Sequence, residues 1–463
     1  MTQTNVEMIS TAQMFGLGAQ IFSGFIFDKT GPTITSAIGL ILVTLGYGLV
    51  YSTFSAKVFY SQHYGLMAFY FCILAHGFSY LYTTALLTNI RNFPNRHNAK
   101  VVAVMDTMFQ LSLFVFTAVY NGAYVRGHLK HEAKQDLQGY ILLMWILGAV
   151  TGILSLLFFH ELPPDETNDE HIRLTDNEGG IGSPVDKTGS RDVIPGSAGV
   201  IPGSPDVSPS DSSDDGEEVR VRPMHHPAEQ AYTNKSTACG FLSVLGYPSY
   251  HALVWGFSII GGLMAMFVTN IGPTLKSVHL VQYVSVIVLI NTLSGLVMRV
   301  LIGPLSDYLF KRVARDVFVM FAYTMCALGF IVLVFFVRSL AAVIISNILL
   351  GSAISITYTL VPVILAEVYG NDHLGLHFGV GKMVEFIVLY VTVLIYGKVY
   401  DSHVVTSYAN MTSYSNVTTS PLLPNFDCYG NDCTQLVFIV SSLLAILAAG
   451  LAALFHILLK KSK

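Results

Sequence analysis

Charged residues are scarce in this sequence. Only 12% of its 463 residues are charged, whereas 52% are hydrophobic, and the mean hydropathy is +0.57. A soluble globular domain usually carries roughly a quarter charged residues. A chain with so few charges cannot cover itself with polar surface. The composition therefore excludes an ordinary soluble domain and indicates a protein of the lipid bilayer.

Motifs for nucleotide hydrolysis and metal chemistry are also missing from the sequence. It contains no G-x-x-x-x-G-K-[ST], no H-E-x-x-H and no paired C-x-x-C. These absences argue against an ATP-driven pump and a metal-dependent hydrolase. A basic domain surface for nucleic acid is absent too. The sequence thus predicts a protein that is not an enzyme and uses no cofactor or metal.

Cysteine and targeting signals add little. The first eleven residues lack a basic segment, so no cleaved signal peptide is expected. Of five cysteines, only Cys428 and Cys433 lie close together in a polar stretch. At most one local disulfide is therefore suggested, between these two residues.

Long apolar runs dominate the rest of the chain. A bilayer core of roughly 30 Å needs about 20 apolar residues per helix. This criterion predicts an all-α membrane protein with eleven transmembrane helices. They lie near 12–27, 34–54, 66–90, 101–122, 139–159, 250–271, 280–302, 316–337, 340–365, 377–399 and 434–458.

An acidic, polar segment divides these runs into five and six. Residues 161–245 hold 16 of the 29 Asp and Glu and are rich in Pro, Gly and Ser. Such a composition cannot bury enough apolar surface to offset its ordering entropy, so we expect disorder. Three regions follow: a helical half at 1–160, a disordered acidic cytosolic loop at 161–245, and a second helical half at 246–463.

Orientation is predicted chiefly by the stretch from 400 to 433. It contains two N-x-T sequons, at Asn410 and Asn416, beside Cys428 and Cys433. Glycosylation and disulfides both belong on the non-cytosolic side of a membrane. We therefore expect this stretch outside, and the acidic loop and the C-terminus inside. A further sequon at Asn234 would then stay unmodified in the cytosol.

A short motif occurs once in each half, where a predicted span enters a cytosolic loop. Both copies read Gly-x-x-x-Asp with a basic residue nearby, and the aspartate can pair with a base or a helix N-terminus. The bland interpretation is two unrelated loop aspartates. The first copy comprises Gly24, Asp28, Lys29 and Gly31, and the second comprises Gly303 and Asp307.

This duplicated motif resembles the signature loop of the major facilitator superfamily. The resemblance implies a major-facilitator fold of two six-helix halves, in which the motif acts as a conformational latch. Since the first span would match the second helix of that plan, the first helix of twelve is expected to be missing. A truncated gene model is one explanation of that deficit.

Further fragments resemble the nodulin-like, monocarboxylate-transporter-like branch of that superfamily. They are N-I-R-N-F-P at 89–94, N-I-G at 270–272, E-V-Y-G at 367–370, H-F-G at 377–379, and G-K-V-Y-D at 397–401 before C-Y-G-N-D-C. The resemblance covers nearly the whole chain. It implies a transporter of a small organic anion such as a monocarboxylate, with protons as a candidate partner. The expected location is the plasma membrane or an endolysosomal or vacuolar membrane.

Four charged residues inside predicted spans are candidates for the solute or ion site, since buried charges in membranes usually face a cavity or a partner. Arg299 can bind a carboxylate in bidentate fashion, or else snorkel to the interface. Asp106 can carry a proton, or else sit near a helix start as a dipole partner. Lys382 and Glu385, at i and i+3, can form an ion pair that opens during transport or is merely structural.

Two functions remain open on this evidence. The first is secondary active transport of a small solute by alternating access across the lipid bilayer. The alternative is a non-transporting sensor or scaffold that keeps the fold, or a truncated form of a twelve-helix carrier.

Overall fold

The computed structural model describes residues 3–94, 97–126, 134–162, 241–310, 312–412 and 428–461. Residues Met1–Glu161 and His226–Lys463 form one compact unit, within which all contacts described below lie. The second unit, Leu162–His225, falls almost wholly outside the described residues. The disorder predicted for 161–245 also concerns residues that are, with few exceptions, outside them.

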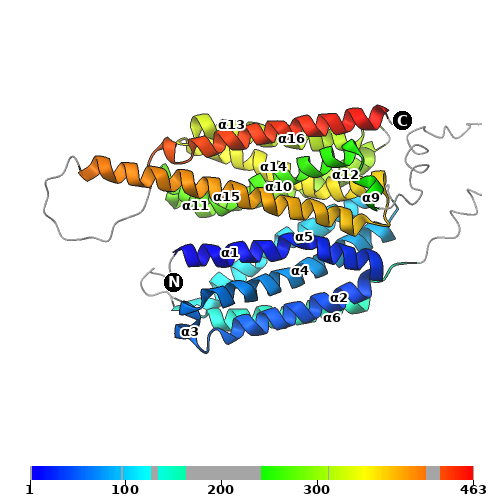
Figure 1. Cartoon of the computed structure of the whole chain (residues 1–463), viewed down its shortest axis with the longest axis horizontal. Coiled ribbons are helices and arrows are strands. Elements are labelled where there is room, and N and C mark those ends of the chain that lie inside the picture. Colours follow the sequence, from blue (N-terminus) through cyan, green and yellow to red (C-terminus); the bar gives the residue numbers. More distant parts are fainter. Residues whose placement is uncertain are drawn as a thin grey trace, which may run out of the picture. The chain divides into compact units, whose positions relative to one another are not determined.

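The described residues are nearly all helical, as predicted (Figure 1). The first half, residues 3–162, contains α1 (Gln3–Gly18), α2 (Gln20–Ser52), α3 (Lys57–Gln62), α4 (Tyr64–Asn92), α5 (Asn98–Val119) and α6 (Leu137–Phe158). A π-helical turn (Tyr120–Tyr124) and a two-stranded hairpin of β1 (Val125–Arg126) and β2 (Lys134–Gln135) connect α5 with α6.

The second half, residues 241–461, follows the same scheme of long helices joined by short connections. It contains α9 (Phe241–Val244), α10 (Pro248–Thr269), α11 (Ile271–Ser277), α12 (Val284–Leu309), α13 (Arg315–Phe336), α14 (Leu340–Tyr369), α15 (Leu374–Thr412) and α16 (Gln435–Lys461). Short 3-10 turns precede α12 (Val281–Tyr283) and α16 (Asn431–Cys433).

Ten helical runs among the described residues are long and apolar enough to cross a membrane. The predicted count of eleven is therefore not confirmed. The difference lies in the first run, Met8–Ser52, which has 45 residues. At 1.5 Å per residue it would extend about 68 Å, more than twice the bilayer core. The predicted spans 12–27 and 34–54 both fall in this run.

Gly31 interrupts that first run. Its backbone has φ 77° and ψ −173°, and Pro32 follows it. The left-handed region of φ is available to glycine without steric cost, whereas a proline cannot continue the preceding helical hydrogen bonding. The chain therefore changes direction within one residue, and α4 packs against both α1 and α2, between which it lies in Figure 1.

Helix α10 occupies the core of the second half. Fifteen of its residues are buried, and it packs against α14, α15 and α16. In the first half α2 packs against α4 and α6, where glycines such as Gly46 and Gly77 allow close approach to the neighbouring helix. Many large apolar side chains point outward on the long helices, as expected of lipid-facing surfaces.

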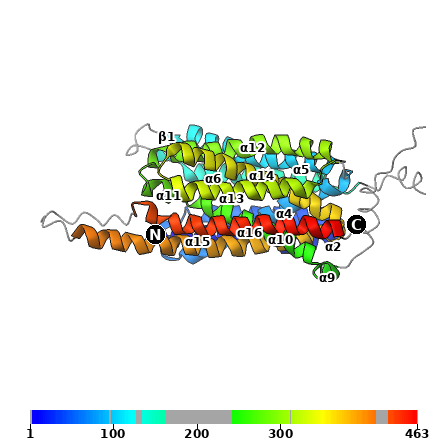
Figure 2. The same cartoon turned by 90° about the horizontal axis from the view of Figure 1, so that it is seen from above.

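The two halves meet mainly through two helix pairs, with smaller contacts of α14 with α5 and of α1 with α15. Helix α12 of the second half packs against α5 of the first, and α2 of the first packs against α15 of the second. In both views the long helices run in roughly one direction (Figure 2). Among the charged candidates, Arg299 and Asp106 meet in this interface, whereas Lys382 and Glu385 lie on α15, one of its helices.

Candidate functional site

Arg299 and Asp106 lie side by side where α12 meets α5. The guanidinium Nη1 of Arg299 donates to the backbone oxygen of Asp106 at 2.9 Å and to Oε1 of Gln110 at 2.6 Å. Arg299 is 5% exposed and Asp106 is 3% exposed. The arginine therefore points into the interface between the halves.

Tyr82 of α4 holds the Asp106 carboxylate. Its hydroxyl donates to Oδ1 of Asp106 at 3.2 Å. The other carboxylate oxygen, Oδ2, is buried and has no hydrogen-bond partner among the described residues, and the same holds for Nε of Arg299. Buried polar atoms in native proteins are nearly always paired, so these two atoms mark a place where an additional ligand can bind.

Lys382 and Glu385 form an ion pair on α15. The Lys382 Nζ lies 2.8 Å from each carboxylate oxygen of Glu385. Tyr358 of α14 donates to Glu385 Oε1 at 2.6 Å and accepts from Lys382 Nζ at 3.2 Å. The Lys382 ammonium also lies 4.6 Å from the centroid of the Tyr358 ring. This second set of charges is thus internally satisfied, unlike the first.

The two tyrosines occupy corresponding positions in the two halves. Tyr82 precedes Asp106 by 24 residues, and Tyr358 precedes Lys382 by 24 residues. In each half, a tyrosine hydroxyl on one long helix is hydrogen-bonded to a charged side chain on the next long helix. Tyr358 was not among the residues predicted from the sequence. The repeated spacing was the signal that could have found it.

Asp28 binds across the interface between the halves. Its carboxylate accepts from the backbone N–H of Gly375 at 3.0 Å and of Leu376 at 2.7 Å, in the first turn of α15. Arg91 at the end of α4 adds an ion pair at 2.8 Å. A carboxylate at a helix N-terminus satisfies backbone donors that have no partner within the helix.

Asp307 makes the reciprocal contact. It accepts from the backbone N–H of Lys100, in the first turn of α5, at 3.0 Å. Arg315 donates to it at 2.6 Å and also forms an ion pair with Glu367 at the end of α14. Each aspartate therefore belongs to one half and binds the start of a helix in the other.

Gly24 and Gly303 allow the close helix crossings at which these two aspartate contacts are made, α2 with α15 and α12 with α5. A side chain at Gly24 would collide with the backbone of Gly375, and one at Gly303 would collide with Ala99 and Ala103. Lys29 does not take part in these contacts. It is exposed over the Phe25 ring, and among the ion pairs of the described residues Asp28 is joined to Arg91 instead.

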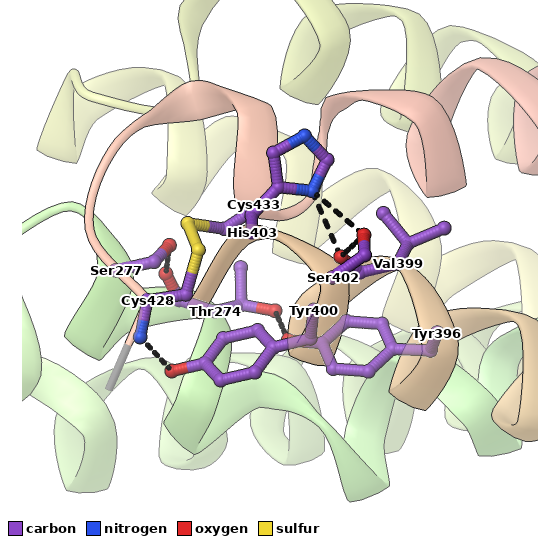
Figure 3. The surroundings of a disulfide bond; sticks show 9 residues. All are labelled: Thr274, Ser277, Tyr396, Val399, Tyr400, Ser402, His403, Cys428 and Cys433. Carbon is purple, nitrogen blue, oxygen red and sulfur yellow. Dashed lines mark hydrogen bonds between the residues drawn. A yellow bond between two sulfur atoms is a disulfide. The ribbon is translucent and has the colours of Figure 1, made fainter. Parts of the chain in front are cut away.

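Cys428 and Cys433 are joined by a disulfide, with Cα atoms 5.9 Å apart (Figure 3). The closed loop rests on the ends of neighbouring helices. Its Gly430 N–H donates to the Ser277 oxygen at 2.9 Å. The Cys428 N–H donates to the Tyr400 hydroxyl at 3.3 Å (Figure 3). Asn410 lies near the end of α15 with its side chain undescribed, and Asn416 lies outside the described residues.

Comparisons with known proteins agree with this architecture. The family model of the Major Facilitator Superfamily matches residues 1–391. None of the curated protein sequences matches the chain. Among solved structures, the chain is similar to the transporter FucP in the outward conformation, with a TM-score of 0.54 and 14% identity, covering 97% of this chain and 91% of that one.

Two further solved structures are similar over nearly the whole chain. One is the proton:xylose symporter XylE, with a TM-score of 0.60, 11% identity and coverage of 97% of this chain and 86% of that one. The other is the human organic anion transporter MFSD10, with a TM-score of 0.54, 13% identity and coverage of 97% and 83%. At these identities the likeness shows the fold alone.

Proposed function

Because the chain belongs to the Major Facilitator Superfamily, we propose that it is a secondary active transporter of a small organic anion such as a monocarboxylate. The observation that carries this proposal is Arg299, a permanently charged side chain at the interface of the halves with an unpartnered Nε. A guanidinium binds a carboxylate through two parallel hydrogen bonds. Solute sites of such carriers lie between the two halves.

The similar structures support an anion only in part. One of them is an organic anion transporter by its description, whereas XylE is described as a proton:xylose symporter. Sugars carry no charge for Arg299 to pair. A buried arginine that is not neutralised by a side chain therefore favours an anionic group on the solute. The assignment of the chain to the nodulin-like, monocarboxylate-transporter-like branch belongs to the same proposal.

Protons are the proposed coupling ion, and Asp106 is the proposed carrier. Its Oδ2 is buried without a partner, so a proton placed there would remove a buried negative charge. Lys382 and Glu385 are proposed to open and close as the halves move, since an ion pair within α15 can exchange its partner for solute.

The crossing contacts of Asp28 and Asp307 are the proposed latch. Both fasten the start of a helix in the opposite half, so both have to release before the halves can separate at that end. The proposed movement is a rocking of residues 1–160 against 246–463 about the solute site, with 161–245 as a cytosolic connection. Gly31 is the proposed turn of the first latch.

The proposed orientation puts the disulfide loop and the sequons at Asn410 and Asn416 on the non-cytosolic side. The membrane is either the plasma membrane or an endolysosomal or vacuolar one. Glycosidase treatment tests this orientation: the mass shift should vanish in an Asn410→Gln, Asn416→Gln variant and persist in Asn234→Gln. A shift lost in Asn234→Gln would invert the topology.

Transport itself is tested by uptake into liposomes of the reconstituted full chain. Radiolabelled carboxylates are offered with and without an inward proton gradient, and we expect saturable uptake that the gradient stimulates. Arg299→Lys should abolish most of it because the ammonium cannot form the fork, whereas Arg312→Lys, at an exposed arginine, serves as the matched control. Absence of flux for every carboxylate, from folded protein, would refute the proposal.

A further inference from the structure

Arg299 and Asp106 carry opposite charges but do not neutralise each other directly. Nη1 of Arg299 reaches the backbone oxygen of Asp106, not its carboxylate. Among the ion pairs of the described residues, none with N···O within 4.0 Å joins either side chain to an opposite charge. The two opposite charges are therefore buried close to each other without forming an ion pair at contact distance.

The neighbouring charges in α15 behave differently. Both oxygens of Glu385 accept from Lys382, and Tyr358 bridges the pair. The charges of this ion pair are satisfied without an additional ligand. The contrast shows that the absence of a partner at Arg299 and Asp106 is particular to that place and is not a general property of charges in this interface.

Each of the two residues also keeps one polar atom free of hydrogen bonds. These atoms are a donor, Nε of Arg299, and an acceptor, Oδ2 of Asp106, and both are buried. Leaving a buried charge unpaired is unfavourable by several kcal/mol. A ligand that offers an acceptor to the first atom and a donor to the second would remove both penalties at once.

From this pair we infer that the solute is a zwitterion, an α-amino acid whose carboxylate binds Arg299 and whose ammonium binds Asp106. The inference deepens the proposed function and rests on it. In an α-amino acid the two charged groups are attached to one carbon atom, so they can meet two adjacent residues. A plain monocarboxylate would satisfy Arg299 but offers no donor to Oδ2 of Asp106, which would then need a proton as well, and a sugar would neutralise neither residue.

The test compares matched solutes on the full chain in lipid nanodiscs. Dissociation constants are measured by calorimetry for alanine, leucine and phenylalanine, and for the analogue of each that lacks the amino group and the analogue that lacks the carboxyl group. We expect at least one amino acid to bind about 10- to 100-fold more tightly than both of its analogues, since each lost charge-assisted hydrogen bond weakens binding by roughly tenfold or more. Equal or tighter binding of every deamino acid would overturn the inference.

A variant of Asp106 tests whether this residue binds the ammonium group of the solute. Asp106→Asn, which keeps the shape of the side chain, should reduce amino acid affinity to that of the deamino acid and leave the deamino acid's own affinity unchanged. Asp401→Asn, at an exposed aspartate of α15, is the control and should leave the ratio as it is. An unchanged ratio in folded Asp106→Asn overturns the inference, and if that variant does not fold, the comparison of solutes on the unmodified chain decides.

Liposome uptake separates failure of this inference from failure of the proposed function. If deamino acids are transported and amino acids are not, the inference of a zwitterionic solute is wrong and the proposed transport of an organic anion stands. If neither kind of carboxylate is transported or bound, both are wrong.

Discussion

Asp106 in α5 and Lys382 in α15 occupy corresponding positions in the two halves and carry opposite charges. Each follows, by 24 residues, a tyrosine whose hydroxyl is hydrogen-bonded to it. The geometry of the site is thus repeated while its charge is reversed. A solute between the halves would meet an acid from one side and a base from the other.

Weakening one latch should favour separation of the halves at that end. Asp28→Asn keeps the size of the side chain but removes the charge that binds Gly375, Leu376 and Arg91. Since hydrogen bonds to charged groups contribute about 1.5–3 kcal/mol each, the conformational equilibrium should shift by roughly tenfold or more. The shift is measured as faster thiol labelling of Leu87→Cys, a smaller side chain at a buried position facing Gly375, in a background without free cysteines. Labelling at the unmodified rate would contradict the latch.

Removing one member of the α15 ion pair should be worse than removing both. Lys382→Met leaves the Glu385 charge without its partner, and Glu385→Gln does the same to Lys382. Each single variant should lose about 3–5 kcal/mol of unfolding free energy, and the double variant should recover much of it. Thermal unfolding of the four proteins in detergent measures this cycle. Additive losses would show that the two side chains do not depend on each other.

The glycines at the crossings should not tolerate a methyl group. Gly24→Ala would press into Gly375, and Gly303→Ala would press into Ala99 and Ala103, so each should destabilise the protein by about 1–3 kcal/mol. Gly397→Ala is the matched control in α15, because nothing lies within 4 Å of the added carbon. It should be neutral or stabilising by about 0.5–1 kcal/mol. Unfolding temperatures that fall equally in all three variants would argue against close crossings.

Opening the disulfide should loosen the loop from the helix ends. The bridge closes a short loop, with Cys428 and Cys433 five residues apart, for which the chain-entropy model gives about 2 kcal/mol. A reductant should therefore lower the unfolding temperature of the unmodified protein and have no effect on a Cys428→Ser, Cys433→Ser variant. The control is Cys72→Ser, which removes a free cysteine and should keep the response. An unmodified protein that ignores the reductant would contradict the prediction.

The sequence predicted the helical membrane fold and the duplicated loop because both depend on local patterns. Apolar run length identified the helices, and Gly-x-x-x-Asp identified the two crossings before any contact was known. The partner of Asp28 could not be predicted in this way. Lys29 is adjacent in sequence, but Arg91, 63 residues away, is the residue that packing brings to the carboxylate.

The unpaired polar atoms of Arg299 and Asp106 could not be predicted from the sequence either. That Arg299 and Asp106 are buried charges followed from their positions in apolar runs. That they meet, and that their polar atoms stay unpaired, depends on how α12 crosses α5, 193 residues away in the chain. The break at Gly31 shows the same limit, since the predicted spans 12–27 and 34–54 both fall in one apolar run and the single residue between its arms decides how many helices are counted.

The reciprocal placement of Asp28 and Asp307 has a consequence for chimeras of such proteins. In each contact the aspartate comes from one half and the helix start from the other. An exchanged half therefore brings one aspartate and one helix start, and both have to fit their partners in the half that was kept. Exchange between relatives will yield a working pair only where the two glycines and the backbone facing them agree in register. Compatibility of halves is therefore decided at two helix ends, and a donor can be chosen by comparing those short segments before the remainder of its sequence.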